Sequence, residues 1–242
     1  LKPLNTKLHN RFPESLMNTP RTNNAIGLET AKMLLDIKAV NFRPEEPYIL
    51  TSGWASPVYI DCRKVISFTE ERRRIMQLAV EMLDDKIGFD KLDYVAGGET
   101  AGIPYAAWIA EAASTPMLYV RKKPKGFGRN AQIEGDMAEG ARVLLVEDLA
   151  TDGASKVTFV NALRNAGAEV SDAFVVFFYG VFSGALENLQ KDGINLHYLA
   201  TWHDVLAAAE AGNYFPSQAI EGVREFLADP IAWSVNNGGK AS

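Results

Sequence analysis

Short apolar segments alternate with segments of helical character through most of the chain, and this alternation constrains the fold more than any other feature. Apolar runs of strand length lie at 94–96, 117–120, 143–146, 173–178 and 196–200. Stretches of helical character lie between them, at 102–113, 154–166 and 183–191. Strands that alternate with helices form a parallel sheet that is covered by helices on both faces. The sequence therefore predicts an α/β protein.

The amino-terminal part of the chain departs from this pattern. Residues 28–40 and 69–87 have helical patterns, and Thr69 is the expected N-cap of the second. Residues 48–67 are instead rich in β-branched and aromatic residues and contain Ser-Gly and Ser-Pro turn signals. We expect this segment to form a small antiparallel unit that caps the main sheet.

These patterns predict one folded domain with a polar extension. Residues 1–25 lack the apolar core of a signal peptide and are expected to be an extension without fixed structure. Residues 26–242 form the predicted domain, with a β-rich hood at about 26–67, a core at about 68–205 and carboxyl-terminal helices at about 202–230. The tail from Ser234 onward is expected to be frayed.

Composition excludes several classes of protein. The 242 residues carry a net charge of −5 and a pI near 5.3, which argues against binding to nucleic acid or to anionic membranes. The one cysteine, Cys62, excludes an internal disulfide and fits a reducing compartment. No apolar stretch approaches the roughly 18 residues of a membrane span. We therefore expect a soluble, cytoplasmic protein without nucleic-acid or membrane partners.

The apolar run 143–146 is followed directly by two carboxylates, Glu147 and Asp148, and then by the loop TDGAS at 151–155. Burying two unpaired carboxylates costs several kcal/mol each, so this pair should meet solvent, a cation or hydroxyl donors. Two such side chains at a strand end could reach the vicinal diol of a ribose, and backbone amides at a helix start suit a phosphate. The pair alone is equally consistent with an ordinary strand end and helix cap.

A second group of charges is basic. Five cations lie within nine residues: Arg121, Lys122, Lys123, Lys125 and Arg129. Gly126 and Gly128 make a mobile loop plausible on sequence grounds. A solvated basic loop or a nucleic-acid patch would show the same run of charge. In a sugar-phosphate-binding protein, this segment is instead expected to be a lid over the phosphates.

Three segments resemble a known family. V-L-L-V-E-D-L-A-T-D-G-A-S resembles the phosphoribosyl-pyrophosphate (PRPP) binding motif of type I phosphoribosyltransferases. Asp152 and Ala154 are less typical there, and we expect the Asp152 side chain to point away from the phosphate. The pattern V-R-K-x-x-K-x-x-G with I-E-G after it, and T-S-G-W-A-S-P-V-Y-I-D-C-R, resemble the catalytic loop and base-contacting hood of orotate phosphoribosyltransferases. The resemblance spans about residues 45–205.

The resemblance implies a fold, a reaction and partners. The fold would be that of type I phosphoribosyltransferases, a Rossmann-like parallel sheet flanked by helices. The enzyme would transfer the 5-phosphoribosyl group of PRPP to N1 of orotate, giving orotidine 5′-phosphate and pyrophosphate in pyrimidine biosynthesis. The resemblance implies that Mg²⁺ is held mainly by PRPP and water rather than directly by the protein, with Asp148 as an additional candidate ligand. A homodimer would share the lid, residues 121–134, between subunits.

The family's motifs also assign roles to residues at matching positions. The catalytic group is Lys125, the main cation, with Arg121, Lys122, Glu147 and Asp148. The PRPP-binding residues are Thr151, Asp152, Gly153, Ala154 and Ser155 at the 5-phosphate, and Gly98, Glu99 and Thr100 at the pyrophosphate. The orotate-binding residues are Ser52, Gly53, Ser56, Tyr59 and Arg63. In this assignment Glu147 and Asp148 hold the ribose hydroxyls.

Three positions depart from the family pattern. Thr51 and Ala101 stand where many or some members have Lys, and Phe127 stands where His is common. The carboxylate of orotate is then expected to meet backbone amides at 52–56, or Arg63. Two alternatives stay open at this point: a phosphoribosyltransferase for another base, and a PRPP-sensing regulator without activity.

Overall fold

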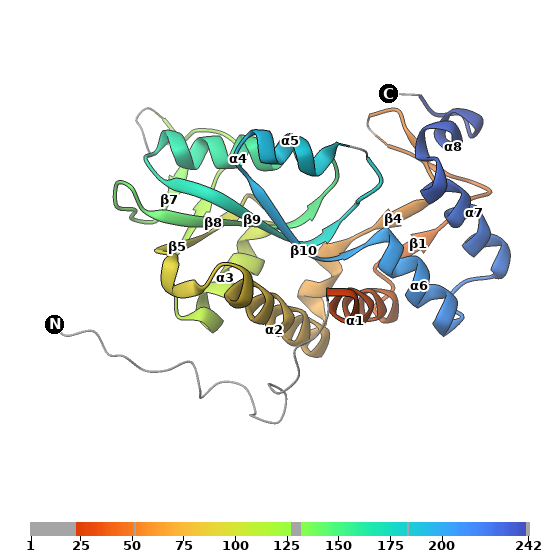
Figure 1. The fold of residues 1–242 in the computed structure, drawn as a ribbon, viewed down its shortest axis with the longest axis horizontal. Helices are drawn as coiled ribbons and strands as arrows, with labels where there is room; N and C mark the ends of the chain where they lie inside the picture. The colour runs from red at the N-terminus through yellow and green to blue at the C-terminus, as the bar shows by residue number, and fades with distance from the viewer. Residues whose placement is uncertain (1–22, 51, 127–131, 183, 241–242) are drawn as a thin grey trace.

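A six-stranded sheet forms the centre of the protein. The structure is a computed structural model that describes residues 23–50, 52–126, 132–182 and 184–240. The strand order is β10-β9-β8-β5-β6-β7, parallel except for the edge strand β7. The strands are β5 (Tyr94–Gly98), β6 (Met117–Val120), β7 (Ile133–Glu134), β8 (Arg142–Ala150), β9 (Glu169–Phe178) and β10 (Asn195–Thr201). The α/β class and the parallel sheet predicted from the alternation are confirmed (Figure 1).

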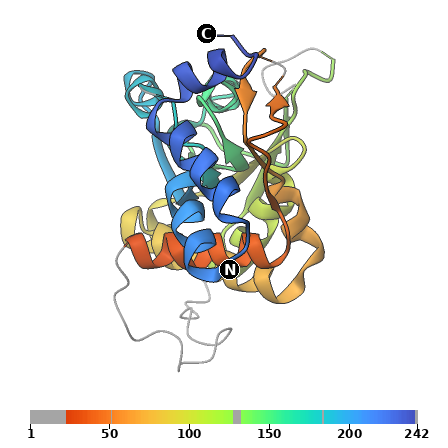
Figure 2. The same cartoon turned by 90° about the vertical axis from the view of Figure 1, so that its right-hand side faces the viewer.

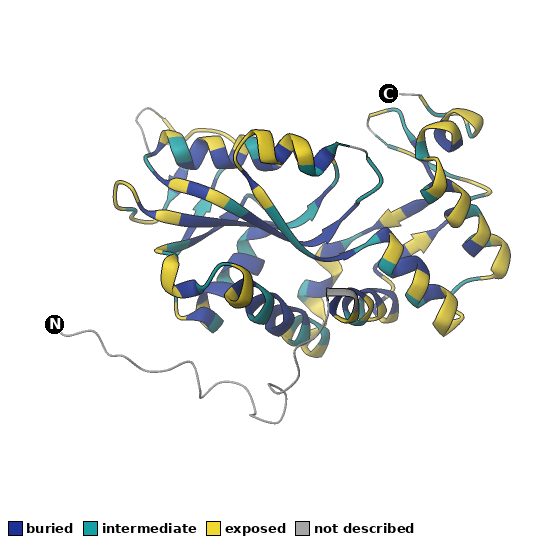
Figure 3. Ribbon diagram, viewed as in Figure 1, coloured by how far each residue is buried: buried dark blue, intermediate teal, exposed yellow. Residues whose placement is uncertain are grey.

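Helices cover both faces of this sheet. α4 (Ala154–Asn165) and α5 (Ala185–Lys191) lie on one face, and α1 (Asn23–Asp36), α2 (Thr69–Lys86) and α3 (Gly102–Ala113) lie on the other (Figure 1). Successive residues of β8 alternate between the two layers, since side chains of a strand point to opposite faces. Leu144 packs in the cluster that contains α2 and α3, and Leu145 packs in the cluster of α4. The interior strands are accordingly buried over most of their length, whereas the edge strand β10 is partly exposed (Figure 3).

Four short strands form two antiparallel pairs beside the carboxyl-terminal helices. β1 (Val40–Phe42) pairs with β4 (Val58–Ile60), and β2 (Tyr48–Ile49) pairs with β3 (Ala55–Ser56). We call these four the hood strands. Two 3₁₀ turns, at Cys62–Ser67 and Phe89–Lys91, flank α2. α6 (Trp202–Gly212), α7 (Ser217–Ala228) and α8 (Pro230–Asn236) complete the chain and lie beside the hood strands (Figure 2).

Two helix boundaries differ from the sequence prediction. α1 spans Asn23–Asp36 rather than 28–40, because Lys38 adopts a left-handed conformation with φ of 56° and β1 begins at Val40. α2 begins at Thr69, so that residue is inside the helix rather than its N-cap. The capping position is Phe68, which makes no side-chain hydrogen bond. Glu70 in the first turn therefore acts on the helix dipole without help from a cap.

The carboxyl-terminal tail is ordered, which contradicts the predicted fraying over residues 234–240. Ser234 is fully buried, and its Oγ accepts a hydrogen bond from the Ala55 amide at 3.0 Å. The same hydroxyl donates to the carbonyl of Lys240 at 2.9 Å. The Lys240 amide in turn donates to the Gly53 carbonyl at 3.0 Å. Backbone groups of the hood thus supply partners that no local pattern in the tail could reveal.

β8 is longer than predicted, and this changes the setting of the two carboxylates. The apolar run ends at Val146, but the strand continues to Ala150. Glu147 lies opposite Val175 and Leu149 lies opposite Phe177, because β9 continues beside it to Phe178. Glu147 and Asp148 are therefore inside an interior strand rather than past its end. None of the helices in the described ranges is long and apolar enough to cross a membrane.

Candidate active site

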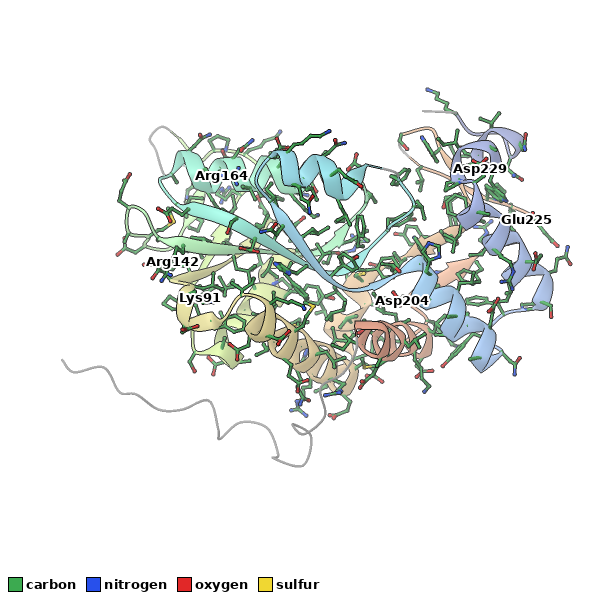
Figure 4. All side chains as sticks on the ribbon, in the orientation of Figure 1. Lys91, Arg142, Arg164, Asp204, Glu225 and Asp229 are labelled. Carbon is green, nitrogen blue, oxygen red and sulfur yellow. The ribbon has the colours of Figure 1, made fainter. Side chains whose placement is uncertain are left out.

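Three loops meet at the carboxyl edge of the sheet. β5 lies between β6 and β8, with Gly98 opposite Val120 on one side and Gly97 opposite Val146 on the other. The loop at 98–102, the lid and the loop at 151–155 therefore leave the sheet side by side. Open parallel sheets bind their ligands at this edge. Figure 4 labels Lys91 and Arg142 at the opposite, amino-terminal edge, away from Glu225 and Asp229 of the carboxyl-terminal region.

Glu147 points toward α4 and meets a buried cation. Its Oε2 accepts a hydrogen bond from Lys156 Nζ at 2.7 Å. Glu147 is 8% exposed and Lys156 2% exposed, so water screens this ion pair very little. Burial raises the pKa of the Glu147 carboxyl, and the Lys156 ammonium opposes that rise. The sequence predicts that these carboxylates meet solvent, a cation or hydroxyl donors. For Glu147 the partner is a cation, Lys156, which the sequence motifs did not identify.

Asp148 points to the other face of the sheet, as the alternation of the strand requires. It is half-buried, and its charge raises the pKa values of the Cys62 thiol and of the Tyr105 hydroxyl, both of which are raised mainly by burial. Burial also raises the pKa of Asp148 itself, with Lys156 and Arg63 acting in the opposite direction. The side chains of Glu147 and Asp148 therefore point to opposite faces of the sheet. That both bind the hydroxyls of one ribose stays a prediction.

Glycines let the loop at 98–102 approach the acidic strand closely. A Cβ atom at Gly98 would overlap the carboxylate of Glu147, and one at Gly102 would overlap the carbonyl of Val146. Between them, the Glu99–Thr100 peptide bond is cis. Glu99 Oε2 accepts a hydrogen bond from the Lys122 amide at 2.7 Å. This contact ties the predicted pyrophosphate loop to the base of the lid.

The predicted phosphate loop turns into α4 at Gly153, which has a φ of 89° and stands at the N-cap. A Cβ there would meet Leu189 of α5, so the position requires glycine on two counts. Asp152 does not point away from the loop, contrary to expectation. Its Oδ1 accepts hydrogen bonds from the Ala154 amide at 3.1 Å and from the Thr151 hydroxyl at 3.4 Å. An aspartate commonly bonds the amide two residues ahead in this way. Ser155 is exposed at the first turn of the helix.

The two described ends of the lid are held by the β6–β7 pair. Arg121 Nη1 lies 3.3 Å from Glu134 Oε1, and the Arg121 amide donates to the Gln132 carbonyl at 2.8 Å. Arg121 is therefore held against the lid's own return strand. Lys122 and Lys125 are exposed. Residues 127–131, including Phe127 and Arg129, lie outside the described residues, as does Thr51.

A cavity of about 700 Å³ lies between the hood strands and the phosphate loop. Aromatic side chains dominate its wall: Trp54 meets Phe182 edge-on, with ring centroids 5.1 Å apart, and Tyr48 lies 5.4 Å from Tyr59. Its lining residues are Tyr48, Ile49, Leu50, Ser52, Trp54, Tyr59, Ile60, Leu149, Thr151, Asp152, Tyr179 and Phe182. The cavity thus places an aromatic wall next to two residues of the predicted phosphate loop.

The residues predicted to bind the base divide into two groups. Ser52 and Tyr59 line the cavity. Ser56 is 1% exposed, and its hydroxyl donates to the Val58 carbonyl at 2.9 Å inside the hood. Gly53 packs against the Lys240 side chain, and Arg63 Nε lies 2.9 Å from Asp61 Oδ1 on the surface. These last three do not line the cavity.

Sequence reasoning missed Lys156, Trp54, Tyr179 and Phe182. Lys156 follows the loop in a helix, where a lysine ordinarily lies in solvent. Trp54 lies inside the quoted hood motif, so its position did carry a signal. Tyr179 and Phe182 follow β9, and only the fold brings them to the hood. Within the described residues, no three His, Cys, Asp or Glu side chains gather in a way that could hold a metal ion.

Comparisons with known proteins agree with this architecture. Orotate phosphoribosyltransferase of Cereibacter sphaeroides is 55% identical over 205 residues, which cover 84% of this chain and 88% of that protein. The crystal structure of orotate phosphoribosyltransferase from Aeropyrum pernix matches with a TM-score of 0.63 and 33% identity, over 77% of this chain and 99% of that one. The Mycobacterium tuberculosis enzyme in complex with PRPP matches with a TM-score of 0.57 and 26% identity, over 76% and 99%. No protein-family model matches. On the strength of these relatives, the chain belongs to the orotate phosphoribosyltransferase family.

Proposed function

We propose that this protein transfers the 5-phosphoribosyl group of PRPP to N1 of orotate, giving orotidine 5′-phosphate and pyrophosphate. The observation that carries the proposal is the cavity that Trp54 and Tyr59 line together with Thr151 and Asp152. A flat base and a phosphorylated sugar need these two surfaces side by side. The family assignment supports the same reaction, a step of pyrimidine biosynthesis.

Different segments at the carboxyl edge of the sheet bind different parts of PRPP. The amides at 153–155 begin a helix and suit the 5-phosphate. Glu147 and Asp148, just before them on β8, take the ribose hydroxyls. The loop at 98–100, with its glycine-permitted approach to β8, takes the pyrophosphate. The hydrogen bond from Asp152 to the Ala154 amide gives way to the phosphate when PRPP binds.

The chemistry needs charge neutralisation and alignment rather than a protein nucleophile. Departure of pyrophosphate leaves positive charge on the ribose C1, as in other glycosyl transfers. Negative charge grows at the same time on the pyrophosphate oxygens. Lys125, exposed on the lid, moves onto these oxygens with Lys122, and closure of the lid excludes water. Arg121 joins them when its side chain leaves Glu134. The cavity holds N1 of the base in line with C1.

Mg²⁺ is the proposed cofactor, and Asp148 fits it. Burial raises the pKa of this carboxyl, and a nearby divalent cation would offset the cost of its charge. The described residues offer no further ligand cluster, so PRPP and water would supply most of the oxygen ligands. When bound, Mg²⁺ neutralises charge on the departing pyrophosphate.

The proposal also covers the assembly and the location of the protein. A homodimer that shares the lid across subunits follows from the family resemblance, since Lys125 is exposed and free to reach a neighbouring site. The carboxylate of orotate meets the backbone amides near Ser52, which lines the cavity. A cytoplasmic location rests on the single cysteine, Cys62.

The test is the loss of orotate, followed by ultraviolet absorbance with PRPP and Mg²⁺ present. Adenine, hypoxanthine and uracil serve as matched acceptors. Loss of orotate alone, dependent on PRPP, is the expected result. Consumption of a purine or of uracil instead would assign the cavity to another base. Binding of PRPP by calorimetry without consumption of any base would favour a sensing role.

A further inference from the structure

The cavity beside the hood strands has no cation in its wall. Asp152 is the one charged residue among the described residues that line it. The base of the proposed reaction, orotate, carries a carboxylate, and a charge that leaves water needs a counter-charge or hydrogen-bond donors. Backbone amides near Ser52 supply donors, but an acid in the wall opposes the approach of an anion. A cation at the rim of the cavity would correct this balance of charge.

The cations of the hood itself are engaged elsewhere. The guanidinium of Arg43 pairs with Glu46. Arg63 Nε lies 2.9 Å from Asp61 Oδ1. The Lys64 ammonium donates to a backbone carbonyl at 2.7 Å. None of these three cations lines the cavity, so a cation for the base must come from another element.

Lys240, in the carboxyl-terminal tail, is such a cation. Its amide donates to the Gly53 carbonyl at 3.0 Å, which holds its backbone against the loop between β2 and β3. Its side chain packs on the same loop, since a Cβ atom at Gly53 would lie 2.8 Å from Lys240 Cδ and 3.1 Å from Cε. The residues on either side of Gly53, Ser52 and Trp54, both line the cavity. The stem of this lysine therefore lies next to two residues of the cavity wall.

The ammonium at the end of this stem is available to a ligand. Lys240 is exposed, and its ammonium has neither a hydrogen-bond acceptor nor an ion-pair partner among the residues that the structure describes. A lysine has a flexible four-carbon stem, so rotation about its bonds can bring the ammonium over the rim of the cavity. The hydrogen bond to Gly53 keeps the base of the stem in place meanwhile. The main cost of reaching an anion is then the lost rotamer freedom of one side chain.

We propose that the Lys240 ammonium binds the carboxylate of the base and supplies the counter-charge that the cavity wall lacks. The inference rests on the proposed function and deepens it, because it concerns the base that occupies the same cavity. It makes the carboxyl-terminal tail part of the binding site, and it makes the protein favour a carboxylated pyrimidine over a neutral one. Lys240 contacts the base and not PRPP, so its effect falls on the affinity for the base.

The test compares Lys240→Met with Lys240→Arg and with Lys91→Met, an exposed control at the amino-terminal edge of the sheet (Figure 4). Methionine keeps much of the stem and leaves the backbone contact in place, but it removes the charge. We expect Lys240→Met to raise KM for orotate about 5- to 30-fold, as for the loss of one partly exposed charged contact. KM for PRPP should not change. Lys240→Arg should keep most of the affinity for orotate, and Lys91→Met all of it.

A neutral analogue separates the charge of Lys240 from its packing on Gly53. The methyl ester of orotate has the same ring without the negative charge. The dissociation constants of orotate and of the ester are measured by calorimetry, and Lys240→Met should change that of the ester less than about twofold. An equal loss of affinity for both ligands would overturn the proposal, because Lys240 would then only support the loop. Unchanged binding of orotate to Lys240→Met would overturn it as well.

The same data distinguish this inference from the proposed function. An unmodified protein that binds orotate but forms no orotidine 5′-phosphate from PRPP would contradict the proposed function. The ratio of the two dissociation constants in Lys240→Met would still decide whether Lys240 binds the carboxylate. An unmodified protein that binds neither ligand would contradict both.

Discussion

The two acidic residues of this site differ in how the protein offsets the cost of burying their charge. Glu147 and Asp148 are neighbours on an interior strand, yet Glu147 accepts a hydrogen bond from the buried Lys156, whereas Lys156 acts on Asp148 through its charge. Burial raises the pKa of the Asp148 carboxyl, so the folded protein holds this proton more tightly than the unfolded chain does. The contribution of Asp148 to stability is therefore complete below its unfolded pKa and is lost as the pH rises through the folded pKa.

Asp148→Asn should remove that penalty. We expect the free energy of unfolding near neutral pH to rise by about 1 kcal/mol, with the gain vanishing toward about pH 4. Turnover should fall at least about 100-fold, because a charged group at the ribose is lost. Urea unfolding at the two pH values, beside the rate of orotate loss, measures both effects.

Asp172→Asn is the control, because its effect on the free energy of unfolding should have the opposite sign. Although burial acts to raise it, the pKa of Asp172 is held below its ordinary value by hydrogen bonds from His197 and Ser171. This variant should lose stability near neutral pH. A destabilised Asp148→Asn would show that the carboxylate is already well compensated in the free protein.

At the scale of elements, α8 and the residues after it hold the hood in place. Ser234 links the Ala55 amide to the Lys240 carbonyl, and the Lys240 amide reaches Gly53. The segment that these contacts fix, 52–55, supplies Ser52 and Trp54 to the cavity. The carboxyl-terminal helix and tail therefore shape the base side of the site.

Ser234→Ala should separate these two sides. The Ala55 amide loses its partner inside the protein, at a cost of about 1–3 kcal/mol. We expect KM for orotate to rise about 3- to 10-fold with KM for PRPP unchanged. Ser217→Ala, at the exposed start of α7, is the matched control and should change neither. An equal rise in both KM values would mean that the loop does not act on the base alone.

The lid offers a test of catalysis with a built-in control. Lys125 and Lys123 are both exposed lid cations, and only Lys125 matches a catalytic position of the family. Lys125→Ala should lower turnover about 10²- to 10⁴-fold without a change in melting temperature. Lys123→Ala removes the same charge and should cost far less. Equal losses would assign the effect to the lid's total charge.

The positions of most helices and strands could be predicted from the sequence, but the contacts between them could not. Apolar runs located every strand from β5 to β10 except the two-residue β7, because buried parallel strands are continuously apolar. The predicted end of β8 was wrong, because the strand continues for as long as it pairs with β9, whatever the polarity of its own residues. Lys156 and Ser234 were missed for the same reason, since their partners come from other elements.

At the scale of the whole molecule, three loops leave one edge of the sheet, and one of them, at 151–155, shares a cavity with the hood strands, which lie beside the carboxyl-terminal helices (Figure 2). The family motifs located these loops from the sequence, and the cavity between them came from the structure. The predicted dimer adds one further requirement, that the lid of one subunit completes the site of the other.

Mixed dimers test this requirement. Lys125→Ala and Glu147→Ala/Asp148→Ala proteins are each expected to be inactive. After re-association, up to about a quarter of the wild-type sites should return, because in a symmetric dimer one of the two mixed sites is intact. No recovery after verified subunit exchange would mean that each chain completes its own site.

The most direct test of the account is the balance of products with PRPP and orotate as the substrates. We predict one orotidine 5′-phosphate and one pyrophosphate for each orotate consumed, no pyrophosphate when orotate is left out, and no turnover when Mg²⁺ is removed by a chelator and restored turnover when it is returned. Pyrophosphate release without orotate, or turnover that survives chelation unchanged, would contradict a Mg²⁺-dependent transfer of the phosphoribosyl group from PRPP to orotate.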